Sequence, residues 1–255
     1  MTAAALTAVP AEGRGTRPGL GRLTLVELRK MTDTRAGFWL QLAIVALTVI
    51  GVVALMLTGE DEDKTLETAL GFAIQPASIL GPVVGVLLVS SEWSQRTAQI
   101  TFSLVPRRMR VLAAKLLAGL AWSLAAFAAS LLAAVIATAA GGVPDAFDLS
   151  AARLLQDFLY LLLAVVGGIA FGAALLASAP AIVLYFVLPL AWSIVGSLAF
   201  LEGAARWLDS SRTFSPMLED ALSGTEWARV ATTVALWILL PLVIGALRIA
   251  RGEVR

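Results

Sequence analysis

The stretch SSEWSQRTAQITFSLVPRRMRVLAAK, residues 90–115, is the longest polar interruption in the first half of a very apolar chain. Apart from Glu92, its charged residues are all basic, and long apolar runs precede and follow it. Lys and Arg accumulate in the cytoplasmic loops of membrane proteins, so the pattern predicts a cytoplasmic loop between two membrane spans. A cytoplasmic loop with no further role would already explain the positive charge of this stretch. The alternation of Ile100 and Phe102 with small polar residues, ended by Pro106, also fits a short ordered element docked on a membrane or a partner.

Composition places the chain among membrane proteins. Of its 255 residues, 59% are hydrophobic and only 15% are charged, against about 45–50% and about 25% in soluble domains. The net charge of +1 gives no overall basic excess of the kind that nucleic-acid binding requires. The chain has no Cys and no His. Thiol catalysis, disulfides, Cys/His zinc sites and a histidine general base are therefore excluded.

Apolar runs of about 18 residues or more, free of charged side chains, predict an all-α integral membrane protein with six transmembrane helices. Only Ser178, Ala179 and Pro180 separate the fourth run from the fifth, which predicts a tight helical hairpin because Pro cannot continue a helix without loss. No Asp, Glu, Lys or Arg lies deep in any run, which disfavours an ion-coupled secondary transporter. The six predicted spans are residues 38–57, 70–89, 116–140, 158–177, 181–201 and 230–247.

The distribution of basic residues predicts the orientation. If both termini are cytoplasmic, the inner segments hold all but five of the 19 lysines and arginines, as the positive-inside rule requires. The five exceptions are Lys64, Arg153, Arg206, Arg212 and Arg229. The outer loops are correspondingly acidic, beginning with the run from Glu60 to Asp63.

Three further segments complete the predicted organisation. Residues 1–21 are rich in Ala, Gly, Thr, Pro and Arg and are expected to form a disordered cytoplasmic tail. Residues 22–36 are expected to form an interfacial elbow helix, or else the first turns of the next span. Residues 202–229 are too long for a simple turn, and their aromatic residues favour short helices at the outer interface over an extended loop.

The second span contains Gln75, Pro76 and Pro82, which are candidates for lining or gating a cavity. Two prolines in one span predict a kinked or unwound helix inside the bundle. The pairs Gly81/Gly85 and Gly168/Gly172 let helix backbones approach closely, and packing within the chain is favoured over a dimer contact.

The residues around the basic stretch resemble the cytoplasmic loop of ABC-2 type transporter permeases. In that family a Glu-aromatic-x-x-x-Thr pattern follows the second span, here Glu92, Trp93 and Thr97. A Leu-x-Pro-Arg-Arg segment ending in Arg107 and Arg108 then leads to a Lys-Leu pair at the foot of the third span. One departure is Arg96, where relatives often have Gly before the Thr. The general layout is similar too: an N-terminal elbow, six spans with both termini inside, a tight turn between the fourth and fifth spans, and an outer helical hairpin before the sixth.

The resemblance implies a coupling helix that docks on a cytosolic ABC ATPase. The residues expected to couple or position it are Glu92, Arg96, Thr97, Pro106, Arg107 and Arg108. The chain has no G-x-x-x-x-G-K-[ST] loop, so it is expected to have no enzymatic activity or cofactor of its own, with ATP and Mg²⁺ bound by the partner. A second permease copy, or a related chain, would complete the transporter in the plasma membrane of a bacterium.

The predicted function is therefore the permease subunit of an ABC exporter that moves an amphipathic drug, lipid or peptide by alternating access. Export is implied by the family alone. The alternative is a non-transport scaffold or anchor that recruits a cytosolic partner. The two differ in whether that partner is a P-loop ATPase whose turnover depends on this chain.

Overall fold

The computed structural model describes residues 19–95, 107–219 and 222–251. Within these residues the chain is all helical, as the apolar runs predict, and contains no strand. The elements are α1 (Leu20–Asp33), α2 (Arg35–Thr58), η1 (Asp61–Asp63), α3 (Leu66–Ser94), α5 (Arg108–Gly141), α6 (Ala151–Leu175), α7 (Ser178–Gly196), η2 (Ala199–Leu201), α8 (Glu202–Leu208), α9 (Ser210–Phe214), η3 (Ser215–Leu218), α10 (Gly224–Val234), η4 (Ala235–Leu239) and α11 (Leu240–Arg251).

In the part of the chain that the structure describes, six helices are long and apolar enough to cross a membrane, which makes this a multi-pass membrane protein. They are α2, α3, α5, α6, α7 and the continuous run α10–η4–α11 over residues 224–251. Each predicted span overlaps one of them, although residues 197–201 of the fifth lie beyond α7, in a turn and in η2.

The break between α6 and α7 lies two residues earlier than predicted. α6 ends with Leu176 in the left-handed region (φ 54°), and Ser178 already begins α7. Pro180 therefore lies in the first turn of α7, where its missing N–H would have no helical partner in any case. The proline follows the turn instead of forming it.

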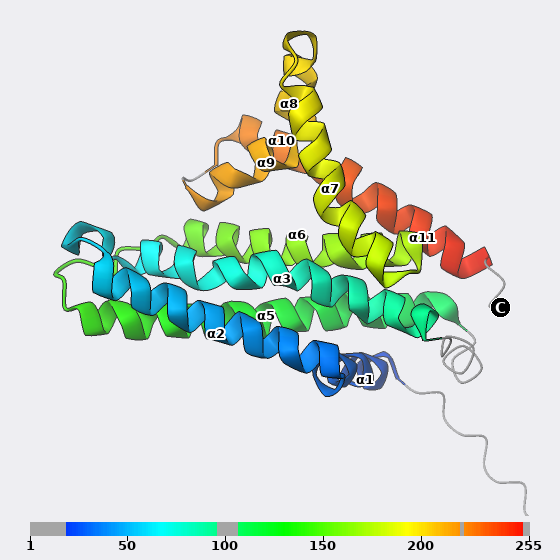
Figure 1. The fold of residues 1–255 in the computed structure, drawn as a ribbon, viewed down its shortest axis with the longest axis horizontal. Helices are drawn as coiled ribbons and strands as arrows, with labels where there is room; N and C mark the ends of the chain where they lie inside the picture. The colour runs from blue at the N-terminus through cyan, green and yellow to red at the C-terminus, as the bar shows by residue number, and fades with distance from the viewer. Residues whose placement is uncertain (1–18, 96–106, 220–221, 252–255) are drawn as a thin grey trace, which may run out of the picture.

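Helices α2, α3, α5 and α6 lie side by side along the long axis of the molecule (Figure 1). The central pair is α3 and α6, which pack together over much of their length. Their backbones touch: a Cβ on Gly85 would collide with the carbonyl oxygen of Val165, and one on Gly168 with that of Pro82. The two glycine pairs thus serve packing within the chain, as predicted.

Helix α3 is continuous from Leu66 to Ser94 although it contains both prolines, so the alternative of an unwound segment is wrong. Near Pro76, the hydroxyl groups of Thr48 and Ser130 donate to the carbonyl oxygen of Ala73 at 3.0 and 3.1 Å. Pro76 has no N–H to donate within the helix. Hydroxyl groups of α2 and α5 therefore supply donors to a backbone carbonyl close to it. The helix lies inside the bundle, as expected.

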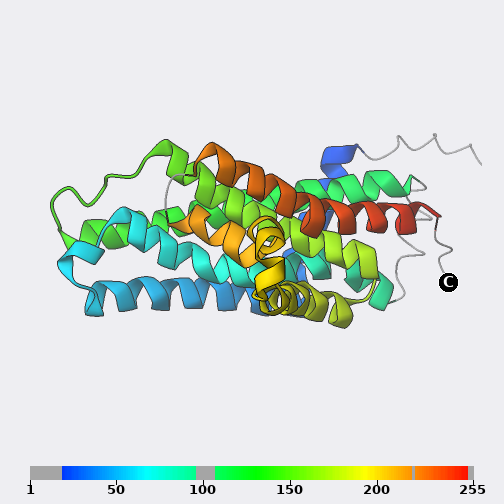
Figure 2. The same ribbon diagram turned by 90° about the horizontal axis from the view of Figure 1, so that it is seen from above.

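Helix α7 leaves the bundle. In Figure 1 it rises steeply away from the other long helices, and α8 lies at its far tip. Figure 2, seen from above, shows α7 and α8 nearly end-on. Ala181 and Gly196 are its buried residues, while apolar side chains such as Ile194 are exposed. The chain returns through α9, η3 and α10 to α11, which packs along α6.

Both ends of the described chain gather at one end of the bundle, called here the α1 end (Figure 1). It holds α1, the C-terminus of α3, the N-terminus of α5, the α6–α7 turn and the end of α11. The predicted coupling loop of residues 90–115 is too wide, because α3 continues to Ser94 and α5 begins at Arg108. Its outer turns are helical because their apolar residues pack against the bundle.

Candidate functional site

A cluster of four charged side chains joins three helices at the α1 end. Glu27 and Lys30 come from α1, Glu92 from the last turn of α3, and Lys115 from α5. Three of them are almost inaccessible, with exposed fractions of 4% for Glu27, 6% for Glu92 and 4% for Lys115. We call this set the charge cluster.

The two carboxylates and two ammonium groups of the charge cluster alternate. Lys30 Nζ lies 2.8 Å from Glu27 Oε1 and 2.6 Å from Glu92 Oε1. Lys115 Nζ lies 2.6 Å from Glu27 Oε2 and 3.3 Å from Glu92 Oε1, and it donates to the carbonyl oxygen of Leu88 at 2.7 Å. Each charge therefore faces opposite charges, which is the condition under which buried ions are tolerated.

Lys30 is the accessible member of the charge cluster. Burial lowers the pKa of Lys30, but the carboxylates of Glu27 and Glu92 more than offset this effect, so the pKa lies above its ordinary value. Lys30 therefore keeps its positive charge throughout the physiological pH range, and the alternation of charges is preserved.

The fold of α1 explains why Glu27 is buried in a mostly basic segment. Glu27 and Met31, four residues apart, are on the helix face that meets the bundle, whereas Leu25 and Val26 are exposed. The helix predicted to be interfacial thus presents a carboxylate to the protein, and its exposed side carries the apolar Leu25 and Val26 together with Arg22 and Arg29. Apolar and basic side chains together suit a helix that lies at a membrane surface.

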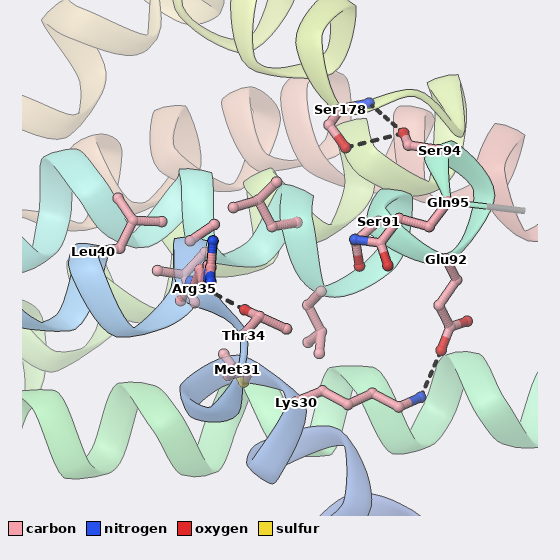
Figure 3. Close-up of a pocket in the computed structure, with 15 residues that line it drawn as sticks. Lys30, Met31, Thr34, Arg35, Leu40, Ser91, Glu92, Ser94, Gln95 and Ser178 are labelled. Atoms are coloured by element: carbon pink, nitrogen blue, oxygen red, sulfur yellow. Dashed lines mark hydrogen bonds and ion pairs between the residues drawn. The ribbon is translucent and has the colours of Figure 1, made fainter. Parts of the chain in front are cut away.

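A cavity of about 710 Å³ lies beside the charge cluster, between α1, α2, α3 and the start of α7. Figure 3 shows Lys30 and Glu92 paired on one side of it and Ser94 and Ser178 on the other. The hydroxyl of Ser178 lies 2.9 Å from that of Ser90 and 3.2 Å from that of Ser94. These bonds attach the first turn of α7 to the last turns of α3.

The α1 end is held together by two arginines as well. Arg108, at the start of α5, donates to the carbonyl oxygen of Ile249 at 3.0 Å, and Arg248 donates to that of Ala174. Arg107 is exposed at the beginning of α5. Among the predicted coupling residues, Glu92, Arg107 and Arg108 thus lie at one end of the bundle, and Arg96, Thr97 and Pro106 lie outside the described residues.

The predicted cavity residues are more scattered. Pro82 is fully buried against α6, Pro76 is half-buried, and Gln75 is exposed on α3. None of the three lines the cavity at the α1 end.

A second buried polar cluster lies at the opposite end of the bundle, in the first turns of α6. Arg153 lies 2.9 Å from Glu67 and 3.2 Å from Asp157, and donates to the carbonyl oxygen of Leu218. Gln156 accepts from the backbone N–H of Leu222 at 3.1 Å. The cluster fastens η3 and the residues after it to α6.

Sequence reasoning missed the partners in both clusters. Glu92 and Lys115 were noted for their positions in a family motif, without being paired with each other, and Glu27 was treated as an ordinary charge of the elbow helix. For Arg153 and Asp157 the sequence did contain a usable signal. The two residues have opposite charges and are four apart, so in a helix they share a face and can pair, and they stand at the start of a long apolar run. No comparable local pattern links residues 27, 92 and 115.

No protein-family model matches the chain, and a search of curated proteins gives no significant match. The function must therefore be inferred from the sites themselves.

Proposed function

We propose that this chain is the membrane-spanning subunit of an ABC transporter of the ABC-2 type, driven by a separate cytosolic ATPase and exporting an amphipathic molecule. The observation that carries the proposal is the charge cluster. It ties the elbow helix α1 to the two helices, α3 and α5, that flank residues 95–107, the segment expected to contact the ATPase.

This arrangement suits the transmission of force. A push on the segment between α3 and α5 reaches α1 through Glu92 and Lys115, and reaches α7 through the bonds of Ser178 with Ser90 and Ser94. Alternating access requires such links between a driven segment and helices that have two stable arrangements. The chain itself has no phosphate-binding Gly-Lys loop, so the energy has to come from a partner.

The proposed orientation places the α1 end in the cytoplasm of a bacterial cell. This end carries the exposed Arg107, the bases of α1 and the last arginines of α11, as the positive-inside rule requires of a cytoplasmic face. The acids of the α2–α3 turn then face outward.

The first test is purification of the tagged chain from its native membranes in mild detergent, followed by an ATPase assay of the eluate. We expect a nucleotide-binding subunit in stoichiometric amount. Arg107→Glu should lower the recovered activity about tenfold, equivalent to about 1.4 kcal/mol of docking free energy. Arg107 suits this test better than Arg108, because Arg108 also holds α11.

Arg251→Glu is the matched control, because Arg251 is also an exposed arginine at the α1 end but lies outside the proposed docking segment. Its ATPase recovery should remain within about twofold of the unmodified chain, within the spread of surface substitutions. A chain that purifies alone, or with a partner that binds no nucleotide, would refute the transporter and favour the scaffold.

The second permease copy is also testable. Helix α7 presents exposed apolar residues away from its own bundle, a surface suited to another membrane subunit. Because the chain has no cysteine, single-cysteine variants need no prior engineering. Ile194→Cys on α7 should form a disulfide-linked dimer in membranes, whereas the equally exposed Ile50→Cys on α2 should not. Equal crosslinking of the two variants would contradict the assignment.

A further inference from the structure

A second cavity, of about 290 Å³, lies between α3, α6, α7, α9 and η4, away from the charge cluster. Its walls are unusually aromatic. The chain contains two tyrosines, and both of them, Tyr160 and Tyr185, line this cavity. The remaining aromatic side chains of its lining are Phe171, Phe186, Phe214 and Trp237.

The rings are held in place by one another and by the backbone. Tyr185 packs edge-to-face against Phe171 and Phe186, with centroid separations of 5.6 and 5.0 Å. The hydroxyl of Tyr185 donates to the carbonyl oxygen of Ala164 at 3.3 Å, and Trp237 Nε1 donates to that of Leu208 at 2.7 Å. With these polar atoms engaged, the two side chains present mainly their ring surfaces to the cavity.

Trp237 owes its position to an irregularity in the last span. Residues 235–239 form η4, a π-helical turn between α10 and α11. Such turns are rare and occur frequently at functional sites. Here the turn places Trp237 in the wall between two cavities, because Trp237 and Phe171 also line a neighbouring apolar cavity of about 330 Å³.

The lining residues restrict the charge of a ligand. No Asp, Glu, Lys or Arg is among them, in contrast to the cavity at the α1 end, which includes Lys30, Arg35 and Glu92. A charged group in the aromatic cavity would have no counter-ion among the lining residues, which is unfavourable wherever the site excludes water. The polar groups on offer are hydroxyls, such as those of Ser210 and Ser211.

The volume of the aromatic cavity restricts the size of a ligand. A cavity of about 150 Å³ with apolar walls is known to hold benzene, so 290 Å³ suits about two rings. The adjoining apolar cavity leaves room for a tail attached to such a ring system.

We infer that this cavity binds an uncharged aromatic ring system of about two rings, as the ring portion of an amphipathic ligand. The walls supply edge-to-face contacts and the serine hydroxyls can hydrogen-bond one polar substituent. That the ligand is the transported molecule rests on the proposed function; binding itself requires neither a partner nor nucleotide.

The test is photo-crosslinking with benzophenone, an uncharged molecule with two aromatic rings and one carbonyl acceptor. The purified chain is placed in lipid nanodiscs without ATPase or nucleotide, irradiated, and mapped by mass spectrometry. We expect adducts in residues 158–171, 183–190 and 210–214, and at least a fivefold lower yield with excess naphthalene. Adducts spread over lipid-exposed residues of α2 and α5 would overturn the inference. So would stronger competition by trimethylphenylammonium than by naphthalene.

Two variants fill the cavity from different sides, Ala164→Leu on α6 and Ser211→Phe on α9. Each should lower the adduct yield at least fivefold, and Ala125→Leu on the exposed face of α5 is the matched control, with no change expected. A filling variant that purifies folded and retains full yield would refute the site. Because the assay omits the ATPase, absence of a nucleotide-binding partner would refute the proposed function and leave this result unaffected.

Discussion

Replacing Lys115 with Met should reveal how strongly the charge cluster holds α1 to the bundle. The substitution keeps the length of the side chain but removes its charge, so that the buried carboxylates of Glu27 and Glu92 both lose their contact with Lys115 and share the charge of Lys30. Lys115 contacts both carboxylates and the carbonyl oxygen of Leu88. Breaking a buried ion pair by removing one partner costs about 3–5 kcal/mol.

The assay is thermal unfolding of the purified chain in detergent. For a chain of this size, each kcal/mol corresponds to about 2–4 °C, so Lys115→Met should lower the Tm by at least about 6 °C. Lys64→Met is the matched control, because Lys64 pairs with Asp61, whose side chain is 83% exposed. Exposed pairs contribute about 0–1 kcal/mol, and the control Tm should change little.

A second substitution tests the mechanism of the loss. Glu27→Gln with Lys115→Met removes one acid and one base, leaving the pair of Lys30 and Glu92 in balance. The double variant should therefore be more stable than the sum of the two single losses, by about 1–3 kcal/mol. Strictly additive losses, or a Tm of Lys115→Met equal to that of the Lys64→Met control, would refute the idea that alternating charges stabilise this end.

Two further substitutions test the remaining contacts. Gly168→Val should prevent stable folding, measured as monodisperse protein on size-exclusion chromatography, because its side chain would collide with the backbone of α3; Gly71→Val, with open space around the glycine, should fold, and equal behaviour of the two would contradict the close contact. Arg153→Met should release η3 and raise the rate of proteolysis after Leu218 several-fold, since it breaks the bonds to Leu218 and Asp157. Arg206→Met, an exposed pair in the same region, should leave that rate unchanged.

The sequence predicted the elements of the fold well because each long span has a local cause. An apolar run of sufficient length forms a helix in a membrane whatever its neighbours are, so the six long helices follow from composition. The glycine pairs also predicted close packing from local sequence, because a helix face without side chains lets another helix backbone approach. The α6–α7 turn was misplaced by two residues because Pro180 is compatible with a first helical turn.

The site was predicted less completely. Glu92 was a candidate, but Glu27 and Lys115 are 88 residues apart and meet only through the packing of α1 on α5. The direction of α7 was equally inaccessible, because a helix that is apolar on all sides carries no amphipathic pattern to say which face meets the protein. Long-range charge pairing and the placement of a uniformly apolar helix both require the tertiary structure.

The close contact of α3 with α6 has a mechanical consequence. At about 1.5 Å per residue, the 29 residues of α3 form a rod about 43 Å long, with Glu67 near one tip and Glu92 near the other. Where backbones touch without intervening side chains, little can be compressed or repacked, so the pair bends less than either helix alone. The pair therefore tilts as one body, so a rotation about the middle of α3 that displaces Glu92 to one side displaces Glu67, paired with Arg153, to the other side.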